Sequence, residues 1–390
     1  MYDFDHIPDR RASDSVKWNT YPEDVLPLWV ADMDFPTPPV VRAALQERLS
    51  HGVFGYPGKP RKVQQAVAGW MSRRHGWEVD PQHVALLPGV VPGLHLAAQA
   101  FAQPGEAVLV QPPVYGRFFD VAREAHLQQQ EAHLVQDANG RYGVDFEAFE
   151  AAITPQTRLF LLCNPQNPTG RVFTPAELER MAGICLRHGV LIVADEIHHD
   201  LVFPGHRHTP IASLSPEIAA HTITLVAPSK TFNIAGLQAA AAIIPDKALR
   251  ERFLAARRGL VEWVNVMGQT AAIAAYEQGE AWLEAVLAYL KANRDHLIDY
   301  AQKSLPGIRV NAPEGTHLAW LDCRESGIAG PPHEFFLRQA RVAINDGRWF
   351  GTGGEGFVRL NFATSRTTLE AALERMQAAL HDMGSSTAQT

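Results

Sequence analysis

One stretch decides how the rest of this sequence folds: Thr224-Leu-Val-Ala-Pro-Ser-Lys-Thr-Phe-Asn-Ile-Ala-Gly236. An apolar, β-branched run ends at Pro228, and Ser229 and Lys230 follow it directly. The pattern predicts a buried strand with a lysine just beyond its end. An ammonium is costly to bury unless it loses its proton or finds a partner. A lysine that forms a Schiff base gains from such a place, because apolar surroundings lower its pKa. The alternative is a solvated lysine at a strand end.

Outward from this stretch, strands alternate with helices. Apolar runs of strand length occupy residues 84–87, 107–110, 158–163, 190–194, 222–226 and 238–244. Strands that are apolar on both faces and alternate with helices are typical of a mostly parallel sheet covered by helices on both sides. We therefore expect an α/β fold. A further strand is expected at 131–135.

The two ends of the chain differ from this middle part. Residues 1 to about 35 predict an extended arm, and from about residue 307 the elements become short, which predicts a smaller α+β domain. We expect an arm with part of the small domain over 1–45, a large domain over 46–280 and a C-terminal small domain over 281–390. The last helix is expected to stop near Gly384.

Three helix starts carry capping signals. Thr37 is expected to cap a helix with Pro38 in its first position. Asp145 is expected to cap the helix that follows it. Thr174-Pro-Ala-Glu177 has the form of a capping box.

Composition excludes several classes of protein. The 390 residues are 46% hydrophobic and 20% charged, which is typical of a globular protein. The net charge is −7 and there is no basic block, so a nucleic-acid partner is not expected. No apolar run reaches transmembrane length, so we expect no membrane partner. The first six residues lack the features of a signal peptide, and the three cysteines do not form a C-x-x-C motif, so we expect a reducing, cytoplasmic location.

Five polar motifs come directly after predicted strands. They are Pro88-Gly89-Val90, Pro112-Pro-Val-Tyr115, Asn164-Pro-Gln-Asn-Pro-Thr-Gly170, Asp195-Glu-Ile-His198 and Ser229-Lys230. In open α/β sheets, ligands bind at the carboxyl ends of the strands. We therefore expect these motifs to converge on one site.

Each motif suits one part of a phosphorylated aromatic ligand, and each has a simpler alternative. Gly89 opens a helix whose first N–H groups suit a phosphate, and Ser229 adds a hydroxyl donor; the alternative is an ordinary strand–helix turn. Tyr115 offers a ring for stacking, or else packs in the core. Asp195 needs a partner such as a protonated pyridine nitrogen, or a nearby Arg or His. Asn167 could bond a phenolic oxygen, or cap its own turn.

Together these groups meet the needs of pyridoxal 5′-phosphate, which binds a lysine, a carboxylate, a phosphate cradle and a stacking surface. The order Gly89, Tyr115, Asn167, Asp195, Lys230 resembles that of the PLP-dependent aspartate-aminotransferase superfamily, over essentially the whole chain. Four segments resemble its cystathionine β-lyase, or C–S lyase, branch: Leu28-Trp-Val-Ala-Asp-Met-Asp-Phe35, Phe54-Gly-Tyr-Pro57, Asp195-Glu-Ile-His-His-Asp-Leu201 and Ser229-Lys-Thr-Phe-Asn233.

The resemblance implies a seven-stranded central sheet and a role for each residue at the ring. Lys230 is similar to the lysine that carries the cofactor and shuttles the proton, and Asp195 to the partner of the pyridinium nitrogen. Asn167 matches the residue that bonds the ring oxygen O3′. His198 stands where many aminotransferases place a tyrosine. Tyr115 matches a stacking residue and is assigned to catalysis.

The resemblance also implies how phosphate, substrate and a second subunit are bound. Gly89, Val90 and Ser229 match the phosphate cradle. Tyr56 matches a tyrosine that reaches the phosphate of a neighbouring subunit, which implies a homodimer with shared active sites. Arg359 matches the arginine that binds the α-carboxylate of an amino-acid substrate, a role that suits its planar fork of donors.

Ala31 and Asn167 are also assigned to the substrate by resemblance. The bond between Asn167 and Pro168 is expected to be cis, as is the bond before Pro113. Leu26–Asp34 and Gly351–Gly356 are expected to form a gate.

Two enzymatic outcomes stay open on the residues alone. A lyase expels a thiolate from Cβ, whereas an aminotransferase returns the proton to the cofactor, and both use every residue named above. The resemblance favours the lyase. A non-catalytic binding protein on the same fold is a more distant alternative.

A metal site is the remaining alternative. Its candidate ligands are His198, His199, Asp200, His206 and His208. Adjacent histidines would point apart on a strand, and the last two lie in a Gly/Pro loop where histidines are usually solvated, so no metal is expected.

Overall fold

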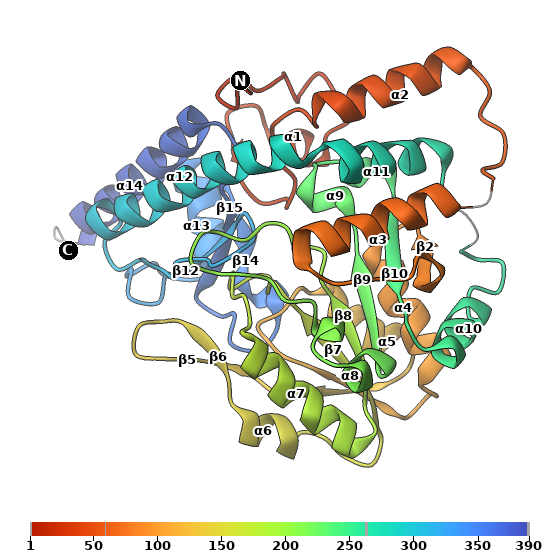
Figure 1. The fold of residues 1–390 in the computed structure, drawn as a ribbon. Helices are drawn as coiled ribbons and strands as arrows, with labels where there is room; N and C mark the ends of the chain where they lie inside the picture. Colours follow the sequence, from red (N-terminus) through yellow and green to blue (C-terminus); the bar gives the residue numbers. More distant parts are fainter. Residues whose placement is uncertain (1, 59, 262–263, 388–390) are drawn as a thin grey trace.

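The computed structural model describes residues 2–58, 60–261 and 264–387, and a seven-stranded sheet lies at its centre (Figure 1). The strand order is β2 (Val84–Leu87), β10 (Ala240–Ile243), β9 (Thr222–Val226), β8 (Leu191–Asp195), β7 (Thr157–Cys163), β3 (Ala107–Val110) and β4 (Gln128–Glu131). β10 is antiparallel to both neighbours and the other four pairings are parallel. The predicted mostly parallel sheet is confirmed.

Alternating side chains of the strands bury both faces of this sheet. On β7, Leu159 and Leu161 pack in one apolar cluster, whereas Phe160 and Leu162 pack in another on the opposite face. The first cluster includes α4 (Val90–Phe101), α5 (Arg117–Glu124) and α10 (Lys247–Ala255). The second includes α6 (Phe146–Ala151) and α7 (Pro175–His188). Helices cover both faces, as the apolar strand pattern predicts.

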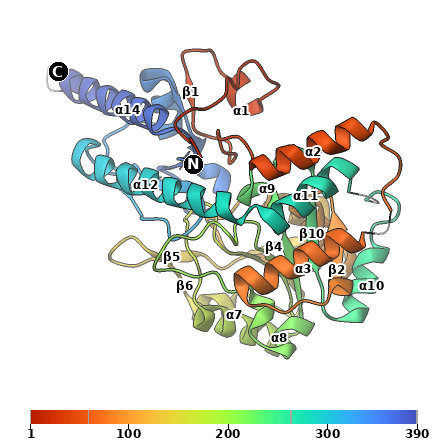
Figure 2. The ribbon, with the colours of Figure 1, turned by 45° about the horizontal axis from the view of Figure 1, so that its top comes forward.

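Further helices lie on the same side of the sheet as α7, toward β9, β10 and β2 (Figure 2). They are α2 (Pro39–His51), α3 (Arg61–His75), α8 (Pro216–Ala220) and α11 (Val266–Gln278). α2 and α3 both pack on α11. The expected boundary between residues 45 and 46 therefore cuts through a single helix that packs on the large domain.

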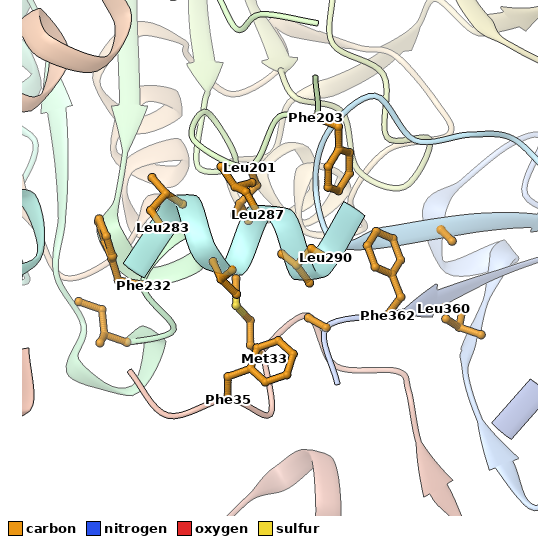
Figure 3. Close-up of a cluster of buried hydrophobic side chains, with 14 of the residues drawn as sticks. Met33, Phe35, Leu201, Phe203, Phe232, Leu283, Leu287, Leu290, Leu360 and Phe362 are labelled. Atoms are coloured by element: carbon orange, nitrogen blue, oxygen red, sulfur yellow. The ribbon is translucent and has the colours of Figure 1, made fainter. Parts of the chain in front are cut away.

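Helix α12 (Glu280–Ser304) connects the large domain to the C-terminal part of the chain (Figure 1). Figure 3 shows Leu283, Leu287 and Leu290 on this helix, surrounded by apolar side chains from distant segments. The surrounding residues are Met33, Phe35, Leu201, Phe203, Phe232, Leu360 and Phe362. Since each buried leucine contributes about 1.5–3 kcal/mol, this cluster holds the arm and both domains together.

The small domain contains a four-stranded antiparallel sheet. Its order is β11 (Arg309–Val310), β12 (Leu318–Asp322), β15 (Phe357–Asn361) and β14 (Asn345–Asp346), with α13 (Pro332–Phe335) and α14 (Arg366–Thr387) beside it. The arm carries α1 (Val16–Asn19) and β1 (Leu26–Pro27), and β1 pairs with β13 (Val342–Ala343). The arm thus joins the small domain. β5 (Leu134–Gln136) and β6 (Tyr142–Val144) form a separate hairpin.

Several local predictions can be compared with these elements. Asp145 caps α6, and Thr174 forms the expected capping box with Glu177. Thr37 does not cap α2; its hydroxyl donates to the Phe232 carbonyl, and the helix begins at Pro39. α14 continues through Gly384, since an isolated glycine in a helix costs only about 1 kcal/mol.

The strand expected at 131–135 is only partly confirmed: Glu131 ends β4, and Leu134 and Val135 belong to β5 of the separate hairpin. The central sheet ends in β4, Gln128-Gln-Gln-Glu131, whose polar side chains are exposed or partly exposed at the edge of the sheet. An exposed edge strand has no apolar pattern to predict it. None of the described helices is both long enough and apolar enough to cross a membrane.

Candidate active site

The predicted motifs meet at a cavity of about 750 Å³ beside the carboxyl ends of the parallel strands. Its lining includes all but one of the predicted site residues: Ala31, Gly89, Val90, Tyr115, Asn167, Asp195, His198, Ser229, Lys230 and Arg359. Tyr56 is the exception. It lies 94% exposed on the loop between α2 and α3, away from this cavity.

Lys230 lies in α9 (Pro228–Thr231), a single helical turn that follows β9. Its Nζ donates a 2.7 Å hydrogen bond to the Ala31 carbonyl oxygen. Burial lowers the pKa of Lys230 from 10.5 to about 8, against the opposing pull of the Asp32 carboxylate. A substantial fraction of this amine is therefore neutral near physiological pH and able to act as a nucleophile or base.

Asp195 is the last residue of β8 and is buried. Its Oδ1 accepts one hydrogen bond, 3.1 Å, from the Ile197 backbone N–H. No salt bridge or side-chain hydrogen bond reaches it from the described residues. Burial raises its pKa from 3.8 to about 7. A buried carboxylate without a cation facing a cavity is complementary to a ligand that presents a protonated nitrogen.

Arg359 is the opposite case, a buried cation without an anion. It lies on β15, 4% exposed, and its two Nη groups donate to the side chains of Asn167 (3.0 Å) and Asn345 and to the Trp29 carbonyl (2.8 Å). Its Nε is buried without an acceptor in the described part of the chain. Burial lowers its pKa from 12.5 to about 10, which leaves the guanidinium charged at neutral pH. This arrangement suits a carboxylate ligand.

The start of α4 has free backbone donors that face the cavity. Its N-terminal residue Gly89 makes no side-chain cap, and the N–H groups of Val90 and Val91 have no acceptor among the described residues. Gly89, Val90 and Ser229 all line the cavity. Free N–H groups and the helix dipole at this end favour a phosphate.

Tyr115 and His198 complete the walls. The Tyr115 ring packs edge-on against Trp349 at 5.1 Å, and burial raises the pKa of its hydroxyl. His198 is buried with its ring 5.9 Å from that of His317, and burial lowers its pKa so that it is neutral at pH 7. Its Nδ1 has no partner within the described residues.

Sequence reasoning missed the residues that hold the predicted ones. Asn345 and the Trp29 carbonyl bind Arg359, and Trp349 supports Tyr115. A backbone carbonyl leaves no trace in the type of side chain, and neither Asn345 of β14 nor Trp349 belongs to a motif that marks it as part of the site. Of the two segments expected to form a gate, residues 29–31 line the cavity, whereas none of 351–356 does.

The histidines after β8 differ from the prediction. His198 and His199 follow the strand in a turn rather than lying on it, and both are buried, as is His208. His206 is partly exposed. His199 and Asp200 instead meet His75 of α3, with ligand atoms within 4.8 Å of one another, a group large enough to consider as a metal site.

Both predicted cis bonds, Pro112–Pro113 and Asn167–Pro168, are cis. A third, Asn164–Pro165, is also cis and was not predicted.

These features fit pyridoxal 5′-phosphate on physical grounds. The unpaired Asp195 carboxylate suits the ring nitrogen, the uncapped start of α4 suits the phosphate, and the Lys230 amine with its lowered pKa suits the aldehyde. Asn167 lies in the same cavity with its amide bonded to Arg359.

Comparison with known proteins agrees with this geometry. The family model for aminotransferase class I and II matches residues 23–376. Cystathionine beta-lyase PatB of Bacillus subtilis (strain 168) is 42% identical over 389 residues, covering 97% of this chain and 99% of the relative. Cystalysin from Treponema denticola, whose crystal structure contains a pyridoxal 5′-phosphate cofactor, is 32% identical with a TM-score of 0.94, covering 98% and 100%. The PLP-bound C-S lyase from Staphylococcus hominis is 33% identical with a TM-score of 0.92, covering 97% and 99%.

The matched model spans most of the chain, and the relatives align over nearly their full length, so the chain belongs to the aminotransferase class I and II family.

Proposed function

We propose that this protein is a pyridoxal-phosphate-dependent carbon–sulfur β-lyase that acts on cystathionine or a related S-substituted cysteine. The observation that carries the proposal is the pair of unpaired, buried charges in one cavity, Asp195 and Arg359, with the Lys230 amine beside them. Two of the relatives reported above are named as lyases of this kind, which favours β-elimination.

The lining of the cavity supports a set of residues that would hold the cofactor. Lys230 would attach it, Asp195 would bind its ring nitrogen, and Asn167 with His198 would bind its ring oxygen. The start of α4 and Ser229 would bind its phosphate, and Tyr115 would stack on its ring. When bound, pyridoxal phosphate supplies an electron-accepting ring conjugated with the amine of the substrate.

The reaction divides among the side chains as follows. Arg359 binds the α-carboxylate through two parallel hydrogen bonds and so fixes the orientation of Cα. Lys230 removes the Cα proton, and its pKa of about 8 matches a base that works near neutral pH. The Cβ–S bond breaks as the Cα=Cβ bond forms, and the thiolate leaves. Addition of water to the released aminoacrylate gives pyruvate and ammonia.

Aminotransfer is the second candidate. The matched family is named for aminotransferases, and the same lysine, aspartate and arginine serve that reaction. The two reactions differ in whether a 2-oxo acid is required. A lyase releases pyruvate from a single substrate, whereas an aminotransferase stops after one half-reaction without an acceptor.

We further propose a homodimer in which Tyr56 reaches the phosphate of the partner subunit. Tyr56 projects from a loop with two more exposed apolar side chains, Val53 and Phe54, and Leu49 is exposed at the end of α2. A cluster of exposed large apolar residues is typical of an interaction surface. In a single chain Tyr56 does not line the cavity that contains Lys230, which agrees with a role in the active site of the partner subunit.

We also propose the three parts expected from the sequence, which are an arm with part of the small domain (1–45), a large domain (46–280) and a small domain (281–390). One boundary changes: the large domain begins at Pro39, the start of α2. A cytoplasmic location is proposed from the three cysteines, all of which are free and buried.

The experiment is a comparison of wild type and Lys230→Ala. Wild type should bind pyridoxal phosphate with a visible absorption band and convert cystathionine to pyruvate. Lys230→Ala should lose both. A variant that keeps the wild-type band would overturn the role of Lys230.

A further inference from the structure

One buried carboxylate close to the site in sequence does not line the cavity and has no part in the mechanism. Asp200 is 2% exposed and sits in the turn after β8, five residues beyond Asp195. Three hydrogen bonds and one ion pair converge on it. Burial of a carboxylate carries a desolvation cost, and these partners offset it.

The partners of Asp200 come from three different elements. Trp70 Nε1 (3.0 Å) and His75 Nε2 (3.0 Å) of α3 donate to Oδ1. The Thr231 hydroxyl of α9 donates to Oδ2 at 2.8 Å, and His199 Nε2 lies 3.1 Å from the same oxygen. Trp70 Nε1 also lies 3.2 Å from Oδ2, so Oδ1 has two partners and Oδ2 has three, which fills the acceptor capacity of the carboxylate.

The charges in this cluster are balanced. The imidazolium of His199 beside it holds the pKa of Asp200 well below its usual range, although burial opposes this. The pKa of His199 is raised by the Asp200 charge against the effect of burial. Burial lowers the pKa of His75 to about 4, so His75 is a neutral donor. The cluster is an ion pair of Asp200 and His199 with neutral donors around it.

The same geometry argues against a metal ion at His75, His199 and Asp200. N–H and O–H groups point at both carboxylate oxygens, which is the arrangement of an anion site. A metal ion would have to displace the Trp70 and Thr231 hydrogens from the oxygens it binds, and a structural site needs free ligand atoms turned inward.

We propose that Asp200 is a positioning residue that fixes Lys230 relative to Asp195. On one side it binds Thr231, the residue next to Lys230 in a helix of only one turn. On the other side it ends the turn that follows Asp195 and carries His198 into the cavity. One buried carboxylate thereby joins the two segments whose side chains act on the cofactor. This inference rests on the proposed role of Lys230.

The chain offers a matched control in the same turn. Glu196 is also fully buried, but its carboxylate binds His208 Nε2 at 3.0 Å and the Ile211 N–H at 2.9 Å. Neither of these groups lines the cavity or belongs to the Lys230 turn. Loss of the Glu196 charge should therefore weaken the fold without moving the lysine.

The test uses Asp200→Asn, Thr231→Val, Thr231→Ser and Glu196→Gln. Thr231→Val keeps the shape of the side chain and removes only the hydroxyl, so it remains informative if Asp200→Asn does not fold. Thr231→Ser restores the donor. Three quantities are measured for each: kcat and KM, the thermal midpoint, and the titration of Lys230 in cofactor-free protein. The titration follows cyanate carbamylation of Lys230 against pH by peptide mass spectrometry.

Asp200→Asn and Thr231→Val should lower kcat roughly tenfold to a hundredfold with KM unchanged, because a small misplacement of a catalytic group has effects of this size. Their Lys230 midpoint should rise from about 8 toward 10.5, as the amine gains access to solvent. Thr231→Ser should behave as wild type in both. Glu196→Gln should lower the thermal midpoint and leave the Lys230 titration unchanged.

Two results would overturn the proposal. One is a Thr231→Val protein with wild-type kcat and a wild-type Lys230 midpoint. The other is a Glu196→Gln protein that shifts both quantities as much as Asp200→Asn does, since the effect would then be general loosening. If wild type neither binds pyridoxal phosphate nor turns over cystathionine, the proposed function fails, and the Lys230 titration in cofactor-free variants still decides the positioning role.

Discussion

The Nζ of Lys230 donates a 2.7 Å hydrogen bond to the carbonyl oxygen of Ala31, which lies 199 residues earlier in the chain. The arm that carries Ala31 is held in place by Asn361 of β15, whose Nδ2 donates to the carbonyls of Val30 and Asp32. Arg359 lies on the same strand. The arm, the large domain and the small domain thus meet at the lysine, and the side chains that would bind cofactor and substrate come from all three.

Asp195→Asn should stabilise the cofactor-free protein at neutral pH. Because the pKa of Asp195 is raised from 3.8 to about 7, the folded state between these values keeps a proton that the unfolded state has released. The stability of wild type therefore falls as pH rises through this window, and an amide escapes that loss. Thermal midpoints of both cofactor-free proteins at about pH 5 and about pH 8 measure it.

The wild-type midpoint should fall further below that of Asp195→Asn at the higher pH. Pyridoxal phosphate should raise the midpoint of wild type more than that of the variant, because only wild type offers a charge to the ring nitrogen. A difference between the two proteins that is the same at both pH values would contradict the raised pKa.

Arg359→Lys should raise KM for the amino acid roughly a hundredfold while the cofactor band stays intact, since a buried charged contact is worth a few kcal/mol. Lysine keeps the charge but loses the planar fork. Steady-state kinetics and an absorption spectrum measure the two effects separately.

Arg117→Lys is the matched control for this variant. Arg117 lines the same cavity, but its side chain is more than half exposed and already paired with Asp120 at 2.8 Å. It should keep a KM near that of wild type. An Arg359→Lys enzyme with unchanged KM would remove Arg359 from the substrate site.

Tyr56 gives a test of shared active sites. Lys230→Ala and Tyr56→Ala proteins should each be inactive or nearly so, yet a mixture refolded together should recover activity. In a hybrid dimer one site has both wild-type residues, and half of randomly formed dimers are hybrids. Recovery should therefore reach about a quarter of wild-type activity. A mixture as inactive as its components would argue that each chain builds its site alone.

The sequence predicted the site better than it predicted the edges of the fold. Five predicted residues end a strand or come shortly after one: Gly89, Tyr115, Asn167, Asp195 and Lys230. Parallel strands place their carboxyl ends at one edge of a sheet, so the convergence of these residues could be predicted. The edge strand β4 and the continuation of α14 through Gly384 could not be, because neither has an apolar pattern.

The supporting contacts could not be predicted from the sequence either. His199 and Asp200 were considered only as candidate metal ligands, and only the fold brings Trp70 and His75 of α3 to them. The Ala31 carbonyl that binds Lys230 is a backbone group, so its role leaves no trace in the type of side chain.

Product analysis with cystathionine as the sole substrate tests the central claim most directly. Purified protein loaded with pyridoxal phosphate is incubated with cystathionine, with no 2-oxo acid added, and pyruvate, ammonia and free thiol are measured over many turnovers. The β-lyase account predicts all three in equal amounts, sustained until the substrate is consumed, and none with Lys230→Ala. Product that stops at one equivalent per active site and resumes only when 2-oxoglutarate is supplied, with glutamate accumulating, would contradict it.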